Sequence, residues 1–320
     1  MTNQSGDDIS SFGELRTRVK AEVSKVVIGQ DHVIDAVLAA MCVGGHVLLE
    51  GPPGTAKTLL AATLSKSLGT SFKRIQFTPD MLPSDVTGTM TLRGGELVYR
   101  PGPVFANIVL ADEINRTPPK TQASLLEAMQ EAQVTIDGEP RALPSPFTVI
   151  ATENPIEYEG TYPLPEAQLD RFLLKVQVLY PSALEELEVL KQGRLGLNPL
   201  AFDNVSTVAG INEIGQAKRE VELVHSNEEI MRYVVNIVQA TRNLPSISLG
   251  ASTRAAVHLY MVAKAFASMS GRNYVTPDDV YSIAPSVLCH RLVMTPEAEL
   301  DRFGPEDAIA AVLNSVPIPR

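Results

Sequence analysis

The chain has 320 residues, of which 44% are hydrophobic and 20% charged, as is ordinary for a globular protein of about two domains. Its net charge of −10 argues against sequence-independent nucleic-acid binding, which relies on clustered Lys and Arg, so no nucleic-acid partner is expected. Cys42 and Cys289 lie far apart without metal-ligand spacing. Neither a disulfide scaffold nor a zinc site is expected, and a reducing cytoplasm fits.

The beginning of the chain carries no targeting signal that we can identify. Residues 1–13 are mostly polar and lack a basic start followed by an apolar run, so we expect a flexible N-terminus and no signal peptide. The most apolar stretch, Val33–Leu49, is interrupted by Asp35, Gly44 and Gly45. We interpret it as a helix, a turn and a buried strand, not as a membrane span, and expect a cytoplasmic protein.

Apolar strand-like runs alternate with helical patterns over the first part of the chain. This alternation predicts an α/β domain over residues 14–181, with a five-stranded, mainly parallel sheet covered by helices on both faces. The expected strands are 46–50, 73–77, 107–110, 148–151 and 172–178, and the expected helices are 14–26, 31–41, 57–68 and 118–130.

Two segments interrupt the alternation. Residues 88–99 read as a hairpin that turns at Gly94-Gly95, and residues 133–143 as one that turns at Asp137-Gly138. Hairpins are common loop fillers, so surface decoration is one interpretation of both.

After Tyr180-Pro181 the pattern becomes helical, which predicts an all-α domain over residues 182–320. Thr276, Pro277 and Asp279 form a helix start, with a cap residue, a proline at the first position and an acid in the first turn. The expected helices are 184–193, 227–241, 251–269 and 277–290.

A glycine-rich segment follows the first strand and precedes a helix. It consists of Gly51, Pro52, Pro53, Gly54, Thr55, Ala56, Lys57 and Thr58. Backbone N–H groups of such a loop and the positive end of the next helix bind phosphates, while the lysine reaches the β- and γ-phosphates and the hydroxyl binds Mg²⁺. Ala56 stands where the usual pattern has glycine, so we expect negative φ there. The alternative is a simple Gly-Pro turn before a helix.

A second candidate site ends the strand predicted at 107–110. The run NIVLADE would deliver Asp112 and Glu113 to the carboxyl edge of the sheet, where ligands bind in open α/β folds. Asp112 could hold Mg²⁺, directly or through water, and Glu113 could orient an attacking water. Two acids at a strand end are otherwise often solvated turn residues. Together with the phosphate loop they predict an ATPase that uses ATP and Mg²⁺.

These segments resemble the MoxR branch of the AAA+ ATPases, a group of P-loop NTPases. The resemblance spans roughly Val26–Leu300 and rests on VVIGQ, GPPGTAKT, LADEINRTPPKTQASLLEAMQE, ATENP, LPEAQLDRF, GASTRA and HRLVMTPEAE. It implies a nucleotide-binding domain followed by an all-α lid domain.

The resemblance also implies roles for single residues. Asn154 would be sensor 1, Arg254 sensor 2 and Arg171 an arginine finger for a neighbouring subunit, while Ile28, Gly29 and Gln30 would pack near adenine. The alternatives are a turn residue for Asn154, an exposed helix residue for Arg254, and for Arg171 an ion pair with Asp170 or Glu166. Arg116 receives no role.

At the level of function, the resemblance implies a homo-hexameric ring that remodels or matures client proteins and works with proteins carrying von Willebrand factor A domains. It also implies that the two hairpins face substrates or partners. Two alternatives stay open: a magnesium-chelatase-like or nucleic-acid motor subunit, and a nucleotide-gated binding switch with little turnover.

Overall fold

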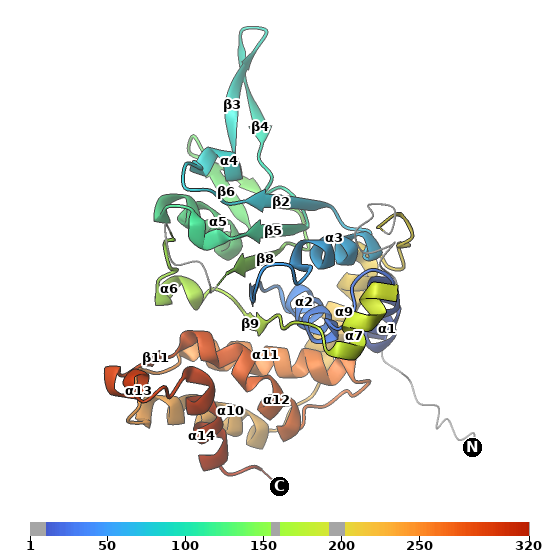
Figure 1. The fold of residues 1–320 in the computed structure, drawn as a ribbon. Coiled ribbons are helices and arrows are strands. Elements are labelled where there is room, and N and C mark those ends of the chain that lie inside the picture. The colour runs from blue at the N-terminus through green and yellow to red at the C-terminus, as the bar shows by residue number, and fades with distance from the viewer. Residues whose placement is uncertain (1–10, 155–160, 192–201, 320) are drawn as a thin grey trace, which may run out of the picture. The chain divides into compact units, whose positions relative to one another are not determined.

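The computed structural model describes residues 11–154, 161–191 and 202–319. They form two compact units: one runs from Val19 to Ile211, and the other combines the residues up to Arg18 with those from Asn212 onward. The first unit contains a five-stranded sheet and the second is mainly helical (Figure 1). The predicted fold class, an α/β P-loop fold with a helical C-terminal part, is confirmed.

The central sheet is entirely parallel, in the order β2-β5-β8-β1-β9. All its strands are short and most are rich in buried apolar residues, as expected when helices cover both faces of a sheet. The order brings the carboxyl ends of β1, β5 and β8 together at one edge. The strands are β1 (Val47–Glu50), β2 (Phe72–Gln76), β5 (Ile108–Asp112), β8 (Thr148–Glu153) and β9 (Leu174–Gln177).

Helices cover both faces of this sheet. Val109 and Val149 belong to a core cluster with residues of α5, whereas Leu110 and Ile150 alternate with them and point to the face where α2 and α3 contact the strands. The helices of the α/β unit are α2 (Asp31–Val43), α3 (Lys57–Ser67), α4 (Pro83–Thr87), α5 (Pro119–Glu131), α6 (Glu166–Leu169) and α7 (Ala183–Lys191), and α1 (Ser11–Val23) spans the boundary between the units.

The two predicted hairpins are present. β3 (Gly88–Arg93) pairs with β4 (Glu96–Pro101) around Gly94-Gly95, and β6 (Gln133–Ile136) pairs with β7 (Glu139–Ala142) around Asp137-Gly138. The β3–β4 hairpin projects from the body of the α/β unit (Figure 1).

The second unit packs its helices around an apolar core. As predicted, Thr276 caps the helix α12, which begins at Pro277: the Thr276 hydroxyl accepts a hydrogen bond from the Asp279 N–H, and the Asp279 carboxylate accepts one from the Thr276 N–H. The unit contains α9 (Ile211–Leu223), α10 (Glu228–Asn243), α11 (Thr253–Met269), α12 (Pro277–Leu288), α13 (Pro296–Leu300), α14 (Pro305–Ser315) and an antiparallel pair, β10 (Ile247–Leu249) with β11 (Val293–Met294). Of these, α9, α13, α14 and the β10–β11 pair were not predicted.

Candidate nucleotide-binding site

The glycine-rich loop connects β1 to α3, and two of its glycines are required by the backbone. A Cβ atom at Gly51 would meet the Val178 carbonyl oxygen at 2.3 Å, which real Cβ atoms do not tolerate. Gly54 has a φ of +82°, a conformation that favours glycine although there is open space around it. The loop therefore takes its shape partly from close packing on the segment after β9 and partly from the positive φ of Gly54.

Ala56 corrects the sequence-based expectation. Its φ is +60° and its ψ is 22°, so it adopts the left-handed conformation that we expected an alanine to avoid. Alanine tolerates this region at a cost of roughly 1–2 kcal/mol. Replacing the usual glycine therefore leaves the turn into α3 in place and adds modest backbone strain.

Lys57, the first residue of α3, folds back onto the loop. Its Nζ donates hydrogen bonds to the carbonyl oxygens of Gly51 at 2.6 Å and Pro52 at 3.0 Å, and the Thr55 hydroxyl also donates to Pro52 at 3.0 Å. Burial lowers the pKa of Lys57, opposed by the nearby carboxylates of Asp112 and Glu113. The ammonium group is thus held at the loop by acceptors that phosphate oxygens could replace.

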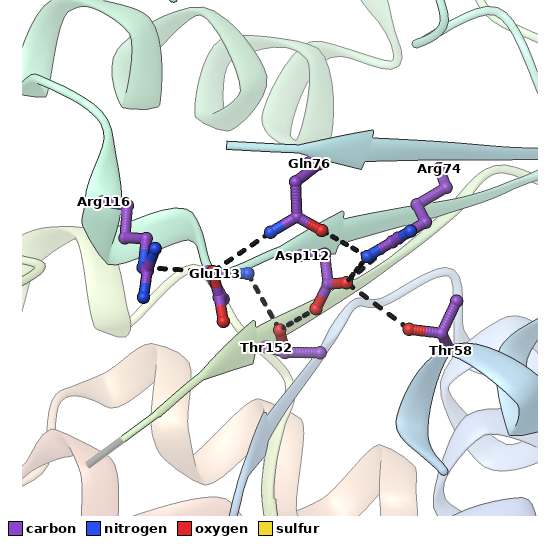
Figure 2. Close-up of polar contacts among 7 residues, drawn as sticks. All are labelled: Thr58, Arg74, Gln76, Asp112, Glu113, Arg116 and Thr152. Atoms are coloured by element: carbon purple, nitrogen blue, oxygen red, sulfur yellow. Dashed lines mark hydrogen bonds and ion pairs between the residues drawn. The ribbon is translucent and has the colours of Figure 1, made fainter. Parts of the chain in front are cut away.

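Asp112 is the last residue of β5, and protein donors serve both of its carboxylate oxygens (Figure 2). The Thr152 hydroxyl donates to Oδ1 at 2.7 Å. Arg74 donates to Oδ2 through Nε at 3.0 Å and Nη2 at 2.7 Å, and the Thr58 hydroxyl donates to the same oxygen at 3.4 Å. The predicted pair of Thr58 and Asp112 therefore meets across the start of α3 and the end of β5.

Glu113 follows at once and has a φ of +57°, which is unusual for a residue with a side chain. This conformation turns the chain out of the strand while the Glu113 N–H donates to the Thr152 hydroxyl at 2.9 Å. The Glu113 carboxylate accepts a hydrogen bond from Gln76 Nε2 at 3.0 Å and pairs with Arg116 Nε at 3.0 Å (Figure 2). Arg116, to which the sequence assigned no role, is therefore an ion-pair partner of Glu113.

The predicted phosphate and acidic segments line one cavity of about 260 Å³. Gly51 and Pro52 lie outside this lining and contribute the carbonyls that hold Lys57. The cavity is lined by Pro53, Gly54, Thr55, Ala56, Lys57, Thr58, Asp112, Glu113, Thr152, Glu153 and Asn154. Asn154 is buried, with 7% of its surface exposed. The sequence analysis did not identify Arg74, Gln76, Thr152 or Glu153, whose positions depend on strand register.

Glu153 introduces a third carboxylate into this lining. Burial raises its pKa, Lys175 opposes that effect, and the neighbouring Glu50 adds to it. Lys175 Nζ lies 3.0 Å from a Glu50 carboxylate oxygen, so one lysine serves two acids at the ends of adjacent strands.

The segment Ile28–Gln30 does not line the cavity. The Gln30 amide donates to the Leu179 carbonyl at 3.1 Å, and a Cβ atom at Gly29 would meet the Glu185 carboxylate within 2.8 Å. The segment thus packs against residues that follow β9, and its contact with adenine remains a prediction.

Arg171 lies elsewhere on the α/β unit, between α6 and β9. Its Nη1 donates to the Leu126 carbonyl at 3.1 Å, and within the described ranges Arg171 forms no ion pair, so pairs with Asp170 and Glu166 are not formed. It lines a second cavity of about 260 Å³ with residues of α5 and α6, including Glu127 and Glu131. This cavity shares no lining residue with the first.

Comparison with known proteins agrees with this geometry. Residues 46–174 match the ATPase family associated with various cellular activities (AAA), and residues 239–312 match the AAA lid domain. The chain is 43% identical to Chaperone MoxR1 of Mycobacterium tuberculosis over 96% of this chain and 84% of that protein. The chain belongs to the MoxR family of AAA+ ATPases. It is also 47% identical to the uncharacterized protein YeaC of Bacillus subtilis, over 93% of this chain and 92% of that one.

A solved structure shares the whole architecture of this MoxR-family chain. The crystal structure of a candidate ATPase from Cytophaga hutchinsonii superposes with a TM-score of 0.89 at 42% sequence identity, covering 97% of this chain and 96% of that one. The match to the lid domain includes Arg254, which is exposed near the start of α11 in the second unit. Its contact with nucleotide remains a prediction.

Membership of the MoxR family implies a nucleotide and typically Mg²⁺, and the residues present fit both. Mg²⁺ prefers oxygen ligands and usually takes one or two from protein, the rest coming from water and phosphates. Thr58 and Asp112 supply such oxygens 3.4 Å apart beside the phosphate loop. Among the described residues no group of three or more His, Cys, Asp or Glu could form an all-protein metal site.

Among the helices of the described residues, none is both long enough and apolar enough to cross a bilayer.

Proposed function

We propose that this MoxR-family chain hydrolyses ATP with Mg²⁺, works as a ring of identical subunits and remodels partner proteins. The observation that carries the proposal is the single cavity lined by residues 53–58 of the phosphate loop, by Asp112 and Glu113 and by Asn154. A triphosphate in this cavity would exchange the loop carbonyls that now hold Lys57 for its own β- and γ-oxygens. Mg²⁺, when bound, would neutralise charge that develops on the transferred phosphoryl group.

Glu113 is the residue we propose to orient the attacking water. The water oxygen would bond to the γ-phosphorus while the bond from that phosphorus to the β–γ bridging oxygen breaks, giving ADP and phosphate. Asn154, buried at the end of β8 in the same lining, would hydrogen-bond this water or the γ-phosphate. Gln76 and Arg116 hold the Glu113 carboxylate and would have to share it with the water.

Arg171 supports the ring. It forms no ion pair within the described part of the chain and lines a cavity separate from the phosphate cavity. An arginine so placed could act on the nucleotide of a neighbouring copy, and such fingers contribute on the order of 10³–10⁵ in rate. We propose six subunits, with each site completed by the neighbour's Arg171.

The β3–β4 hairpin supports a role in contacting other proteins. Near its turn, Leu92 is 71% exposed and Leu97 68% exposed, although large apolar side chains gain by burial. MoxR1 of Mycobacterium tuberculosis carries the name chaperone. By family resemblance we propose chaperone-like action on client proteins and a partner that carries a von Willebrand factor A domain.

Nucleotide binding and phosphate release test this proposal on the purified chain. Lys57→Ala should abolish binding of a fluorescent ATP analogue, whereas Lys73→Ala, which removes an exposed lysine of β2, should bind like the wild type. Glu113→Gln should bind ATP without turning it over, and specific activity of the wild type should rise with protein concentration. Normal turnover by Glu113→Gln would remove Glu113 from its proposed role. Nucleotide binding without any phosphate release at high concentration would instead favour a binding switch.

A further inference from the structure

Asp112, the acid proposed to hold Mg²⁺, already forms an ion pair with the guanidinium group of Arg74. Arg74 of the edge strand β2 places both Nε and Nη2 on a single oxygen, Oδ2, at 3.0 and 2.7 Å (Figure 2). The other oxygen is taken by Thr152. Because the Thr58 hydroxyl also reaches Oδ2, the arginine occupies the same carboxylate oxygen that the predicted metal ligands share.

The two partners of this ion pair differ in exposure. The Asp112 side chain is 11% exposed and that of Arg74 is 47% exposed. A buried carboxylate is costly without a compensating charge, whereas a half-exposed guanidinium can return to water at little cost. The Arg74 side chain can therefore move away into solvent, whereas Asp112 stays buried and needs another positive charge in its place.

We propose that Arg74 is the resident counter-cation of Asp112 and that it makes Mg²⁺ loading depend on nucleotide. This inference rests on the proposed function. While Arg74 neutralises Oδ2, free Mg²⁺ meets a compensated carboxylate and a nearby positive charge, so the metal alone binds poorly. The negative charge of a nucleotide at the phosphate loop compensates for that positive charge, and only then does Asp112 accept the metal. Arg74 is thus a positioning residue that acts through Asp112.

The experiment measures equilibrium binding of a non-hydrolysable ATP analogue, with Mg²⁺ and with EDTA, to four forms of the full chain. These are the wild type, Arg74→Gln, Arg74→Lys and Lys73→Gln. Lys73 is the matched control because it lies next to Arg74 on β2, is exposed, and points to the other face of the sheet. A parallel series measures the shift of Tm caused by millimolar Mg²⁺ without nucleotide.

The factor by which Mg²⁺ tightens nucleotide binding should fall roughly tenfold in Arg74→Gln, the scale of a typical coupling between two sites, because Mg²⁺ then binds Asp112 without waiting for nucleotide. Mg²⁺ alone should raise the Tm of Arg74→Gln and leave that of the wild type unchanged. Arg74→Lys keeps a charge but cannot place two N–H groups on one oxygen, so we expect a decrease of about two- to threefold. Lys73→Gln should match the wild type in both series.

Three outcomes would contradict the proposed role of Arg74. An unchanged or larger Mg²⁺ factor in Arg74→Gln, in a protein that binds the analogue, would overturn this inference and leave the proposed function intact. Should Arg74→Gln fail to fold, an unchanged factor in Arg74→Lys would overturn it as well. A wild type that binds no nucleotide in either buffer would overturn the proposed function and this inference with it.

Discussion

Two Arg–Asp pairs, one in each compact unit, use the same two side chains in different ways. In the helical unit, Arg272 binds Asp279 with two parallel bonds, one to each carboxylate oxygen. In the α/β unit, Arg74 places two bonds on one oxygen of Asp112 and leaves the other to a threonine. The Arg272 side chain is 27% exposed and that of Arg74 47%. Arg272 thus binds both oxygens of its aspartate, whereas Arg74 binds only one and is more exposed to solvent.

The difference indicates how an arginine can be assigned from its surroundings. In the bidentate pair at a helix cap, Arg272 binds both oxygens of Asp279 and Thr276 also donates to that carboxylate, so the pair stabilises the fold. A pair on one shared oxygen at the edge of a cavity leaves room for a metal. Arg171 is a third case, since a backbone carbonyl is its partner within the described residues. Under the proposed function, its charge acts on a group of a neighbouring copy.

The largest expected effect concerns Arg171. Arg171→Ala should lower the rate of phosphate release by about 10³ or more while the nucleotide affinity stays within about twofold, because we propose that the arginine acts on a neighbour's transition state. The Tm should hardly change, since a single carbonyl bond is lost. Phosphate release, analogue binding and thermal melting measure the three quantities.

Mixing makes this prediction sharper. Arg171→Ala carries Glu113 without the finger, and Glu113→Gln carries the finger without the carboxylate. Mixed rings should regain activity where a Glu113 site faces an intact Arg171. Inactivity at every mixing ratio would contradict action across a subunit interface.

Arg272→Gln should give a stability effect without a nucleotide effect. Breaking the pair leaves a largely buried carboxylate, so we expect the free energy of unfolding to fall by about 2–3 kcal/mol, below the full cost for a completely buried pair. Arg232→Gln is the control, because its pair with Glu228 is exposed and is expected to contribute less than about 0.5 kcal/mol. Denaturant titrations measure both losses. A weaker nucleotide affinity in Arg272→Gln would contradict the view that the Arg272–Asp279 pair only stabilises the fold.

The pH dependence of this pair has a definite sign. Burial raises the pKa of Asp279, but hydrogen bonds from Arg272 and Thr276 outweigh burial and lower it overall. A carboxyl with a lowered pKa in the folded state contributes stability above its unfolded pKa, and this is lost as pH falls below about 4. Arg272→Gln should therefore lose less stability than the wild type on acidification through that range.

The sequence was sufficient for the parts of the fold that local patterns control. Apolar runs ending in polar residues predicted β1, β5 and β8, and Thr276 predicted the start of α12. It was insufficient for α9, whose segment carries Gly215 and buries few apolar residues. The β10–β11 pair joins two- and three-residue strands from distant parts of the chain, so no local signal announces it.

The residues of the site divide in the same way between those with a local sequence signal and those without one. Lys57, Thr58, Asp112 and Glu113 follow from motif spacing and strand ends. Arg74 and Gln76 contribute only because β2 lies beside β5 in a register that sets Gln76 opposite Asp112. A single sequence does not contain that register, so the pair on which the proposed metal exchange depends was visible only in the structure.

His46 adds a buried polar group that belongs to the fold. Its ring donates through Nε2 to the Met129 carbonyl at 2.9 Å and accepts through Nδ1 from the Val149 N–H at 3.0 Å. Burial lowers the pKa of His46 to about 4 from 6.5, although the bond to Met129 opposes this. A histidine with a lowered pKa in the folded state destabilises that state as pH falls below the unfolded pKa.

We therefore expect His46 to contribute a loss of about 2 kcal/mol in the free energy of unfolding between about pH 7 and about pH 5. Urea titrations across this range should show a flatter dependence in His46→Gln. His32→Gln, which replaces an exposed histidine, should retain the wild-type slope. An unchanged slope in His46→Gln would show that other groups cause the acid sensitivity.

The smallest expected effect comes from Ala56→Gly, which tests the backbone conformation of the phosphate loop. With φ at +60°, Ala56→Gly should raise the free energy of unfolding by less than about 1 kcal/mol, because relief of left-handed strain slightly exceeds the entropy that glycine loses. If Ala56 instead had the negative φ that the sequence predicted, Ala56→Gly would lower the free energy of unfolding by about 0.5–1 kcal/mol. Ala132→Gly is the matched control, since Ala132 ends α5 with a φ of +49° and should respond with the same sign. Opposite signs for the two variants would place Ala56 outside the left-handed region and return the loop to the geometry first expected from its sequence.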